Sequence, residues 1–393
     1  MKLLLFGSRY LPYRHEGDKN FWLSLVETLK REVEHICIIS VNRDQSGDYF
    51  QAPNVHIRNV SPFPFPTIRS SFSDPNLRLS NNYVSKSLSF LKIHGQISRI
   101  VREKNVQVVH FMDNYGPLMV RLKRRLNVPL SIFAPTYHPR YPLYDYFLRL
   151  SFVPFEKIIT TTYAFKGRLV NLGIPEDKIE VIRWGVNTDE LKPNCRMREQ
   201  TREKLGIDPD SRIIFWSGFL QQIGVRDLQY SLKIAKETLK QKNDYTFIFA
   251  LKYVHFKEEY VSYEKEGIKI LAVKSNMEFL NLVNAADAFL SPILTENSIV
   301  APPLTWIECM AYCVPIVTTN VRGVDELISD GHTGYTFSTI KEASQKIQTM
   351  LTDETSYRKI SVNARRIVCR EYDIKGIANK FIDLWKQMSE WRR

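Results

Sequence analysis

The stretch "PPLTWIECMAYCVPIV", residues 302–317, predicts a helix followed by a strand, the unit from which the whole chain is built. In that helix Leu304, Ile307 and Ala311 would form one apolar stripe at 3.6 residues per turn. Glu308 falls in the middle of the stripe. Because a carboxylate is costly to bury unless a partner binds it, the stretch indicates a binding site at this helix.

Strand and helix patterns alternate along the chain in two series. The first series has apolar, strand-like runs at residues 2–8, 35–41, 106–112, 130–135, 157–162 and 179–185. The second has them at residues 212–218, 245–251, 268–273, 287–292 and 315–319. The helix expected after the first run carries a core-facing stripe made of Trp22, Leu25, Val26 and Leu29. Two α/β domains with doubly wound, Rossmann-like parallel sheets are therefore predicted, facing each other across a cleft.

The two series also suggest domain boundaries. A length of 393 residues is too great for one ordinary core, and a polar stretch that ends in the turn pattern "DPDS" separates the two series. The expected order is an N-terminal domain at 1–190, a linker at 191–210, a second domain at 211–370 and a final helix at 371–393. That last helix has an apolar stripe, and we expect it to pack back on the N-terminal domain.

Composition narrows the class of protein. The hydrophobic fraction of 44% and the charged fraction of 25% are ordinary for a globular protein, and no apolar run is long enough to span a membrane. The start of the chain is too short and too polar for a signal peptide. Five scattered cysteines without a CxxC pair fit a reducing compartment and no zinc site. A cytoplasmic protein is expected.

Positive charge is concentrated in one part of the chain. The net charge is +13, and residues 51–150 hold 14 Lys and Arg against 4 Asp and Glu. An anionic membrane surface or an anionic substrate would explain this bias, and so would general solubility. Within this part, the segment 61–92 is rich in Pro, Ser and Arg and also contains phenylalanines. It could enter a membrane interface, line an acceptor groove, or be an ordinary long loop.

The helix predicted at 303–313 has the features of a nucleotide site. Two prolines lack N–H groups, so the N–H groups of Leu304 and Thr305 would point out of the helix start, where the helix dipole favours phosphate. Glu308 lies one turn further. A carboxylate there would repel an anion but can accept hydrogen bonds from the two hydroxyls of a ribose. Phosphate and ribose together indicate a nucleotide.

Three segments of the sequence resemble GT-B-fold glycosyltransferases of retaining family 4 (glycosyl transferases group 1). The segment 306–337 resembles the donor-domain pattern of that family, 157–193 the end of its acceptor domain, and 217–228 the start of its donor domain. The resemblance covers nearly the whole chain. It implies transfer of a sugar from a nucleotide-sugar co-substrate, most often a UDP-sugar, to a glycan or lipid-linked glycan acceptor.

The resemblance assigns roles to residues of the second domain. It implies that Glu308 binds the ribose and that the backbone at Leu304 and Thr305 holds the diphosphate. It also implies that Ser217 and Gly218 lie in a glycine loop near the phosphates. No metal ion and no further cofactor are implied, and no Asp-x-Asp pair follows a predicted strand.

Other assignments concern the reacting sugar. His138 matches the acceptor-domain histidine beside the transferred sugar, and Gly17 matches a loop that approaches the phosphate and the acceptor. The family usually has two glutamates separated by seven residues, but Val300 occupies the first position here. Glu296 is the nearest glutamate and could reach the sugar only if its loop is rearranged. His110 is expected to be a supporting residue of the cleft.

The family's usual phosphate-binding cations are also missing. The positions of the Arg and Lys that follow the glycine loop hold Phe219 and Ile223. Because two phosphates in a cleft need positive charge, Lys252 at a strand end is the candidate substitute, with an ordinary solvated lysine as the alternative. Arg226 is a weaker candidate.

The resemblance implies a retaining mechanism. A leaving phosphate oxygen would take the acceptor proton, so domain closure and positioning supply most of the catalysis. Three alternatives stay open: a catalytically inactive GT-B protein that partners an active transferase, a DNA-modifying GT-B enzyme, and a sugar epimerase. No basic recognition helix is visible, so nucleic acid is not the expected partner. A peripheral contact between the basic N-terminal domain and an anionic membrane is expected instead.

Overall fold

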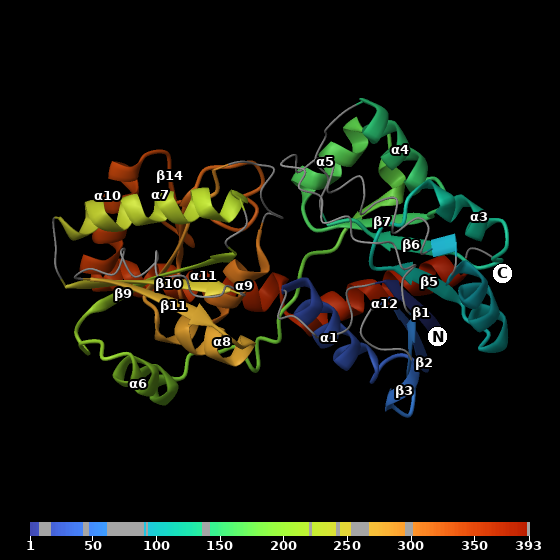
Figure 1. Ribbon diagram of the computed structural model, residues 1–393, viewed down its shortest axis with the longest axis horizontal. Helices are drawn as coiled ribbons and strands as arrows, with labels where there is room; N and C mark the ends of the chain where they lie inside the picture. The colour runs from blue at the N-terminus through green and yellow to red at the C-terminus, as the bar shows by residue number, and fades with distance from the viewer. Residues whose placement is uncertain are drawn as a thin grey trace. The chain divides into compact units, whose positions relative to one another are not determined.

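The chain forms two compact units, each built on its own sheet (Figure 1). The computed structural model describes residues 1–7, 17–41, 47–60, 90–91, 93–135, 142–219, 222–240, 244–252, 267–294 and 302–390. The first unit consists of Met1–Trp184 together with Ile374–Arg393, and the second of Gly185–Asp373. The second unit is therefore inserted into the sequence of the first.

The sheet of the first unit has eight strands in the order β3-β4-β2-β1-β5-β6-β7-β8. All neighbouring strands are parallel except β3 and β4, which pair antiparallel. The strands are β1 (Lys2–Gly7), β2 (His35–Val41), β3 (Gly47–Ala52), β4 (Val55–Val60), β5 (Val108–Phe111), β6 (Leu130–Phe133), β7 (Lys157–Thr160) and β8 (Ile179–Val181). The order reverses beside β1, as the predicted doubly wound sheet requires.

Helices cover both faces of this sheet (Figure 1). They are α1 (Gly17–Leu29), a helix that includes residues 93–103, α3 (Val120–Lys123), α4 (Pro142–Phe152), α5 (Tyr163–Asn171) and α12 (Ile374–Glu390), with the short 3-10 turns η1 (Pro117–Met119) and η2 (Glu176–Lys178). The predicted stripe of α1 is fully buried, and α12 packs against α1. The last helix of the chain thus completes the first unit.

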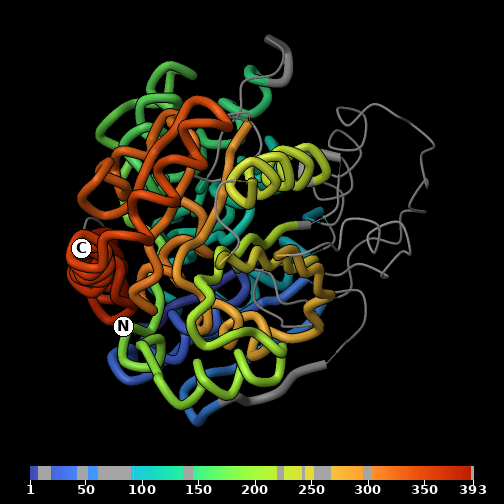
Figure 2. The backbone as a smooth tube through the Cα atoms, turned by 90° about the vertical axis from the view of Figure 1, so that its left-hand side faces the viewer, coloured from blue at the N-terminus to red at the C-terminus, as the bar shows by residue number. Residues whose placement is uncertain are grey.

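The sheet of the second unit has six parallel strands in the order β11-β10-β9-β12-β13-β14. They are β9 (Arg212–Phe219), β10 (Tyr245–Lys252), β11 (Ile268–Val273), β12 (Ala288–Ser291), β13 (Ile316–Thr319) and β14 (Gly334–Phe337). The helices are α6 (Cys195–Lys204), α7 (Gln222–Leu239), α8 (Asn276–Ala285), α9 (Leu304–Ala311), α10 (Ile340–Thr352) and α11 (Glu354–Glu371). Helices α7 and α10 pack together on one face (Figure 1 and Figure 2). The predicted pair of parallel-sheet domains is confirmed.

The chain enters and leaves the second unit at one place. Val186 and Asp373 form a parallel β-bridge, and the N–H of Val186 donates to the carbonyl of Tyr372 at 2.9 Å. The hydroxyl of Thr188 donates to the Asp373 carboxylate at 2.5 Å. The two ends of the inserted unit are therefore fastened to each other.

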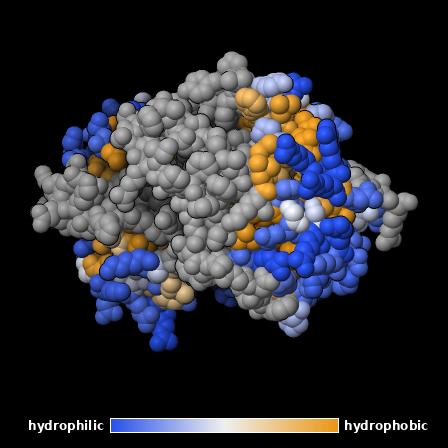
Figure 3. Space-filling view, turned by 45° about the vertical axis from the view of Figure 1, so that its right-hand side comes forward, coloured by the Kyte–Doolittle hydropathy of each residue, from blue (hydrophilic) through white to orange (hydrophobic). Residues whose placement is uncertain are grey.

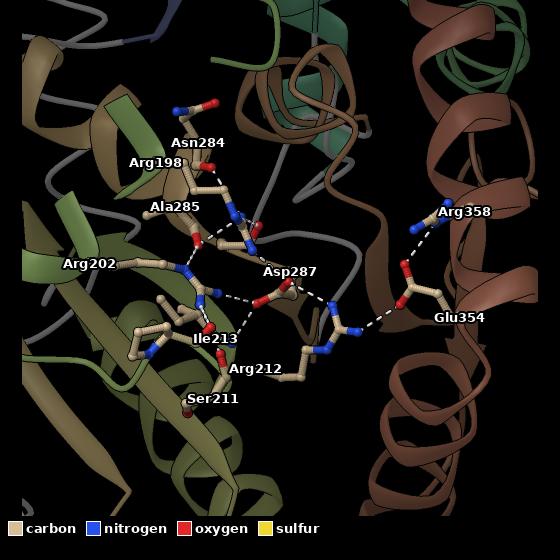
Figure 4. A network of polar contacts seen from close by, with 12 residues as sticks. Arg198, Arg202, Ser211, Arg212, Ile213, Asn284, Ala285, Asp287, Glu354 and Arg358 are labelled. Carbon is tan, nitrogen blue, oxygen red and sulfur yellow. Dashed lines mark hydrogen bonds and ion pairs between the residues drawn. The ribbon is translucent and has the colours of Figure 1, made fainter. Parts of the chain in front are cut away.

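Residues 191–210, expected from the sequence to be a linker, contain α6, and this helix is part of the second unit. Its attachment is polar. Arg198 and Arg202 of α6 donate to the two carboxylate oxygens of Asp287, each at 2.7 Å. They also donate to backbone carbonyls at the end of α8 (Figure 4). Because α6 is held by arginines, its sequence lacks the apolar stripe that marks a packed helix.

Asp287 is the centre of this network (Figure 4). Its side chain is only 1% exposed. Besides the two arginines of α6, it accepts the N–H of Ile213 at 2.7 Å and a contact from Arg212 at 3.3 Å. Arg212 in turn reaches Glu354 of α11 at 2.7 Å. One buried carboxylate therefore joins α6, β9 and, through Arg212, α11.

His110 lies in the core of the first unit. It is fully buried on β5 among the rings of Trp22, Phe381 and Trp385. Its Nδ1 atom lies 2.8 Å from the hydroxyl of Ser131, and within the described residues its Nε2 atom has no hydrogen-bond partner. Burial lowers the pKa of His110 to about 3. The expectation that His110 is a cleft residue is wrong, because the aromatic rings of α1 and α12 enclose it.

In the part of the chain that the structure describes, no helix combines the length and the apolar character needed to cross a bilayer.

His110 predicts an acid-dependent loss of stability. Its pKa is lower in the folded chain, so between pH 6.5 and about 3 the unfolded chain binds a proton that the folded chain does not. The free energy of unfolding should therefore fall with decreasing pH below 6.5, by up to about 1.4 kcal/mol per pH unit. Urea denaturation from pH 7 to pH 5 should show that slope reduced in His110→Phe and kept in His94→Gln. An equal slope in both variants would contradict the assignment.

Asp287 predicts a large effect from a small substitution. In Asp287→Asn, three arginines lose the carboxylate that compensates them in a buried setting, so the free energy of unfolding should fall by about 3–5 kcal/mol. Glu354→Gln, at the exposed end of the same network, should cost less than about 1 kcal/mol. Chemical denaturation of both variants makes the comparison. Equal effects would show that the network is not centred on Asp287.

Candidate functional site

The start of α9 lies at the carboxyl edge of the second sheet. Pro303 is the residue before the helix and, with its extended backbone, provides no side-chain cap. The N–H of Trp306 is the first that bonds back, to the carbonyl of Pro303 at 3.0 Å. Within the described residues, the N–H groups of Leu304 and Thr305 have no acceptor. Free N–H groups at the positive end of a helix suit an anion such as phosphate.

Glu308 follows one turn later and is 6% exposed. The other residues of α9 from Trp306 to Ala311 are buried as well, so the helix is enclosed on all sides and not only along one stripe. Burial and, after it, the charge of Glu308 raise the pKa of the Tyr312 hydroxyl. The glutamate therefore lies near Tyr312, in surroundings of low polarity where hydrogen bonds from ligand hydroxyls would be strong.

Strand-end hydroxyls fix the segment that leads to α9. The indole N–H of Trp306 donates to the hydroxyl of Ser291 at 2.9 Å, and the Thr318 hydroxyl donates to the carbonyl of Ser291 at 2.7 Å. The Thr319 hydroxyl accepts the N–H of Ile293 at 2.8 Å and donates to its carbonyl at 2.7 Å. The ends of β12 and β13 and the first turn of α9 are thus held in one arrangement.

The end of β9 contributes Ser217 and Gly218. The Ser217 hydroxyl is buried and has no hydrogen-bond partner among the described residues. A side chain at Gly218 would come within 2.5 Å of the Trp216 ring, so packing alone requires glycine there. A ligand oxygen at this strand end could accept a hydrogen bond from the Ser217 hydroxyl.

Lys252 is the last residue of β10, and its backbone pairs in register with Phe219 of β9 and Val273 of β11. The strand therefore places Lys252 at the same edge as Ser217 and the start of α9. Its side chain lies outside the described residues. Arg226, the weaker candidate, is exposed on α7.

Several predicted residues cannot be compared with the structure. His138, Glu296 and the Val300 position lie outside the described residues. Gly17 is the first residue of α1 in the first unit, whereas the residues above belong to the second unit, and each unit is described by itself. The roles given to these four positions stay predictions.

Asp227, which no sequence pattern singled out, contacts the segment that leads toward α9. It lies on α7, where it accepts the N–H of Leu294 in the segment that leads toward α9. Burial raises its pKa to about 6, against the opposing effect of that hydrogen bond. An aspartate on a charged amphipathic helix usually faces solvent, so the sequence pattern did not indicate that this aspartate is buried. The loop after β12 is thus tied to α7 as well as to β13.

Two side-chain hydrogen bonds hold the turn after β11. The Ser275 hydroxyl accepts the N–H of Glu278 at 3.1 Å, and the Glu278 carboxylate accepts the N–H of Lys274 at 2.8 Å. The two hydrogen bonds hold the backbone at the start of α8 much as a capping box does, with the glutamate accepting from the residue before the N-cap Ser275. The turn lies at the carboxyl end of β11, the same edge of the sheet as the start of α9.

Two protein-family models match the chain, one over each unit. The family described as Glycosyltransferase Family 4 matches residues 20–190, and the family described as Glycosyl transferases group 1 matches residues 197–367. An uncharacterized 41.2 kDa protein in the cps region of Klebsiella pneumoniae is 24% identical over 77% of this chain and 82% of that protein. The amylovoran biosynthesis glycosyltransferase AmsK of Erwinia amylovora is 25% identical over 46% of this chain and 43% of that protein.

Solved structures share the fold along almost the whole chain. A glycosyltransferase from Rickettsia africae superposes with a TM-score of 0.73 at 18% identity, over 98% of both chains. HepE from Anabaena, crystallised in complex with UDP, superposes with a TM-score of 0.73 at 15% identity, over 98% of this chain and 100% of its own. With both family models on its two parallel-sheet units, the chain belongs to the GT-B glycosyltransferases of the family 4 type.

Proposed function

We propose that this glycosyltransferase moves a sugar from a UDP-sugar to a hydroxyl of a glycan or lipid-linked glycan, with retention, in the assembly of a polysaccharide or glycoconjugate. The relative AmsK acts in amylovoran biosynthesis, and HepE was crystallised with UDP and with UDP-glucose. These proteins support the choice of donor and pathway class. We expect a cytoplasmic location with peripheral membrane contact.

The single observation that carries the proposal is the start of α9. Two N–H groups without acceptors among the described residues lie at the positive end of a buried helix, and Glu308 follows one turn later. A diphosphate would accept hydrogen bonds from the N–H groups, and the ribose hydroxyls would donate to the carboxylate. The hydroxyls of Ser291, Thr318 and Thr319 keep the helix start in position before a donor arrives.

The proposed chemistry needs little from the protein beyond positioning. The donor diphosphate leaves the anomeric carbon while the acceptor hydroxyl attacks from the same face, and a phosphate oxygen takes the acceptor proton. His138 and Glu296 would stabilise the sugar at its charged stage. In our proposal Lys252 and the N-terminus of α9 balance the phosphate charge without a divalent metal.

A catalytically inactive partner of an active transferase is the second candidate. Three departures from the family pattern favour it: Phe219 and Ile223 replace the usual cations, and Val300 replaces the first glutamate. Calorimetric titration with UDP-glucose separates the two. Absence of binding by any nucleotide sugar at millimolar concentration would favour the inactive partner, and binding with turnover would exclude it.

Glu308→Gln tests the ribose contact. Because the amide lacks the charge that strengthens the hydrogen bonds from ribose, UDP affinity should fall about 10- to 100-fold. The loss should be as large for uridine, which has the ribose but no phosphate. Isothermal titration measures both. Wild type should also discriminate against UDP that lacks the ribose 2′-hydroxyl, and the variant should not.

Glu237→Gln, on α7, is the matched control for the loss of one carboxylate. If Glu308→Gln remained folded by circular dichroism and bound UDP as wild type does, Glu308 would be a structural residue.

Lys252→Met tests the substitute cation. Removal of a charge that faces the diphosphate should weaken UDP about tenfold while the affinity for uridine stays unchanged. Arg226→Met, which removes an exposed charge from α7, should leave both affinities unchanged. Isothermal titrations of the two variants decide whether Lys252 binds the diphosphate or is an ordinary solvated lysine. Equal UDP affinity in wild type and Lys252→Met would make Lys252 an ordinary solvated lysine.

A further inference from the structure

Helices α3, α4 and α5 form one layer on a single face of the first sheet. The α3 segment connects β5 to β6, α4 connects β6 to β7, and α5 connects β7 to β8. These four strands are consecutive neighbours, so three right-handed crossovers in the same direction must lie on the same face. The end of α5 meets α4, because a side chain at Gly173 would come within 3.3 Å of the Arg149 guanidinium.

The helix α4 is apolar on both of its sides. Its inner side packs in the core through Leu148 and Phe152, which are 8% and 4% exposed. Its outer side presents Tyr146 and Phe147, which are 57% and 45% exposed, and Val153, directly after the helix, is 57% exposed. Tyr146 and Phe147 lie edge to face with ring centroids 5.8 Å apart. An ordinary surface helix has only one apolar face, so a second, exposed apolar side on α4 is unusual.

The helix α5 repeats the outer pattern of α4. Tyr163 and Val170 are exposed, with the same spacing of seven residues as Tyr146 and Val153. Three residues after each tyrosine there is a basic residue, Arg149 on α4 and Lys166 on α5. Eight large hydrophobic residues are exposed in the described part of the chain, and five of them lie on these two helices or directly after α4. The exposed apolar surface is thus concentrated in one layer.

The same layer is strongly positive. The helices α3, α4 and α5 with the two arginines that follow α3 carry seven Lys and Arg against one Asp: Arg121, Lys123, Arg124, Arg125, Arg149, Lys166 and Arg168 against Asp145. Lys123 and Lys166 have carboxylate partners, and Arg121, Arg124 and Arg125 are exposed. On the space-filling surface, hydrophobic patches lie directly beside strongly hydrophilic ones (Figure 3).

We propose that this outer face of α3, α4 and α5 docks the enzyme on an anionic lipid bilayer. The tyrosine and phenylalanine rings and the valines enter the boundary between headgroups and acyl chains, where amphipathic rings are favoured. The surrounding arginines and lysines are attracted to anionic headgroups. A stable protein interface has few charges at its apolar centre, whereas here basic residues alternate with the apolar ones, which favours lipid over a protein partner.

Docking would bring the enzyme close to a lipid-linked acceptor, since such an acceptor is held in the bilayer. The biological role of membrane docking rests on the proposed function, but the docking itself does not. Vesicles that contain neither donor nor acceptor test the docking face, whereas nucleotide titrations in the absence of lipid test the transferase site, so either can fail alone.

The experiment is co-sedimentation of the full chain with vesicles of phosphatidylcholine alone or mixed with phosphatidylglycerol. We expect binding to the mixed vesicles, little to the neutral ones, and release by added salt. The double variant Phe147→Ser, Val153→Ser should bind the mixed vesicles about tenfold more weakly. The double variant Arg121→Glu, Arg124→Glu should lose at least as much.

Matched controls come from the second unit. Val362→Ser removes an exposed valine, and Lys233→Glu with Lys236→Glu reverses two exposed charges on α7. Both should bind the mixed vesicles as wild type does. All variants should keep the circular dichroism spectrum and the UDP affinity of wild type.

Three results would overturn the proposal. They are absence of binding to the mixed vesicles, equal binding to neutral vesicles, and equal losses in the control variants.

Light scattering of the protein without lipid tests whether the same face joins two copies of the chain. A dimer that the Phe147 variant dissociates would show that this face joins two copies of the chain, and would also reject the membrane.

Discussion

All six strands of the second unit run parallel, so their carboxyl ends must meet at one edge of the sheet. That constraint gathers Ser217, Lys252, Ser291 and the start of α9, which are far apart in the sequence. Hydroxyls at the ends of β12 and β13 then fix the approach to α9, and Asp227 holds the same segment from the other face of the sheet. The position of the candidate site is set by the direction of the strands, and individual side chains then fix its details.

Much of this arrangement could be predicted from the sequence, because it follows from apolar spacing. The stripe of α1 and the strands of both sheets are defined by residues that must be buried, and such residues repeat with a period. The helix α6 could not be predicted in this way. Arg198 and Arg202 attach α6 to the buried carboxylate of Asp287. In the sequence, an arginine that pairs with a buried carboxylate cannot be told from an arginine that faces solvent. For the same reason, no sequence pattern indicated that α6 belongs to the second unit.

The errors at single residues have a related cause. His110 ends a strand of the first series and so suggested a ligand site, but the aromatic rings of α1 and α12, more than 200 residues apart in the chain, close over it. Asp227 was missed because its burial depends on the loop after β12. In both cases the environment of the residue is made by distant segments, which no local pattern contains. The family resemblance, unlike a local pattern, carries such non-local information, and the candidate donor-site residues therefore come from it.

The pairing of Val186 with Asp373 shows how the chain is divided. The second unit is an insertion whose two ends are tied together, and the final helix α12 belongs to the core of the first unit, around Trp22 and His110. In evolutionary and engineering terms the second unit is therefore an exchangeable module. A different 185–373 segment with the same paired ends could be exchanged into the chain, whereas removal of the last twenty residues would damage the unit at the opposite end of the sequence.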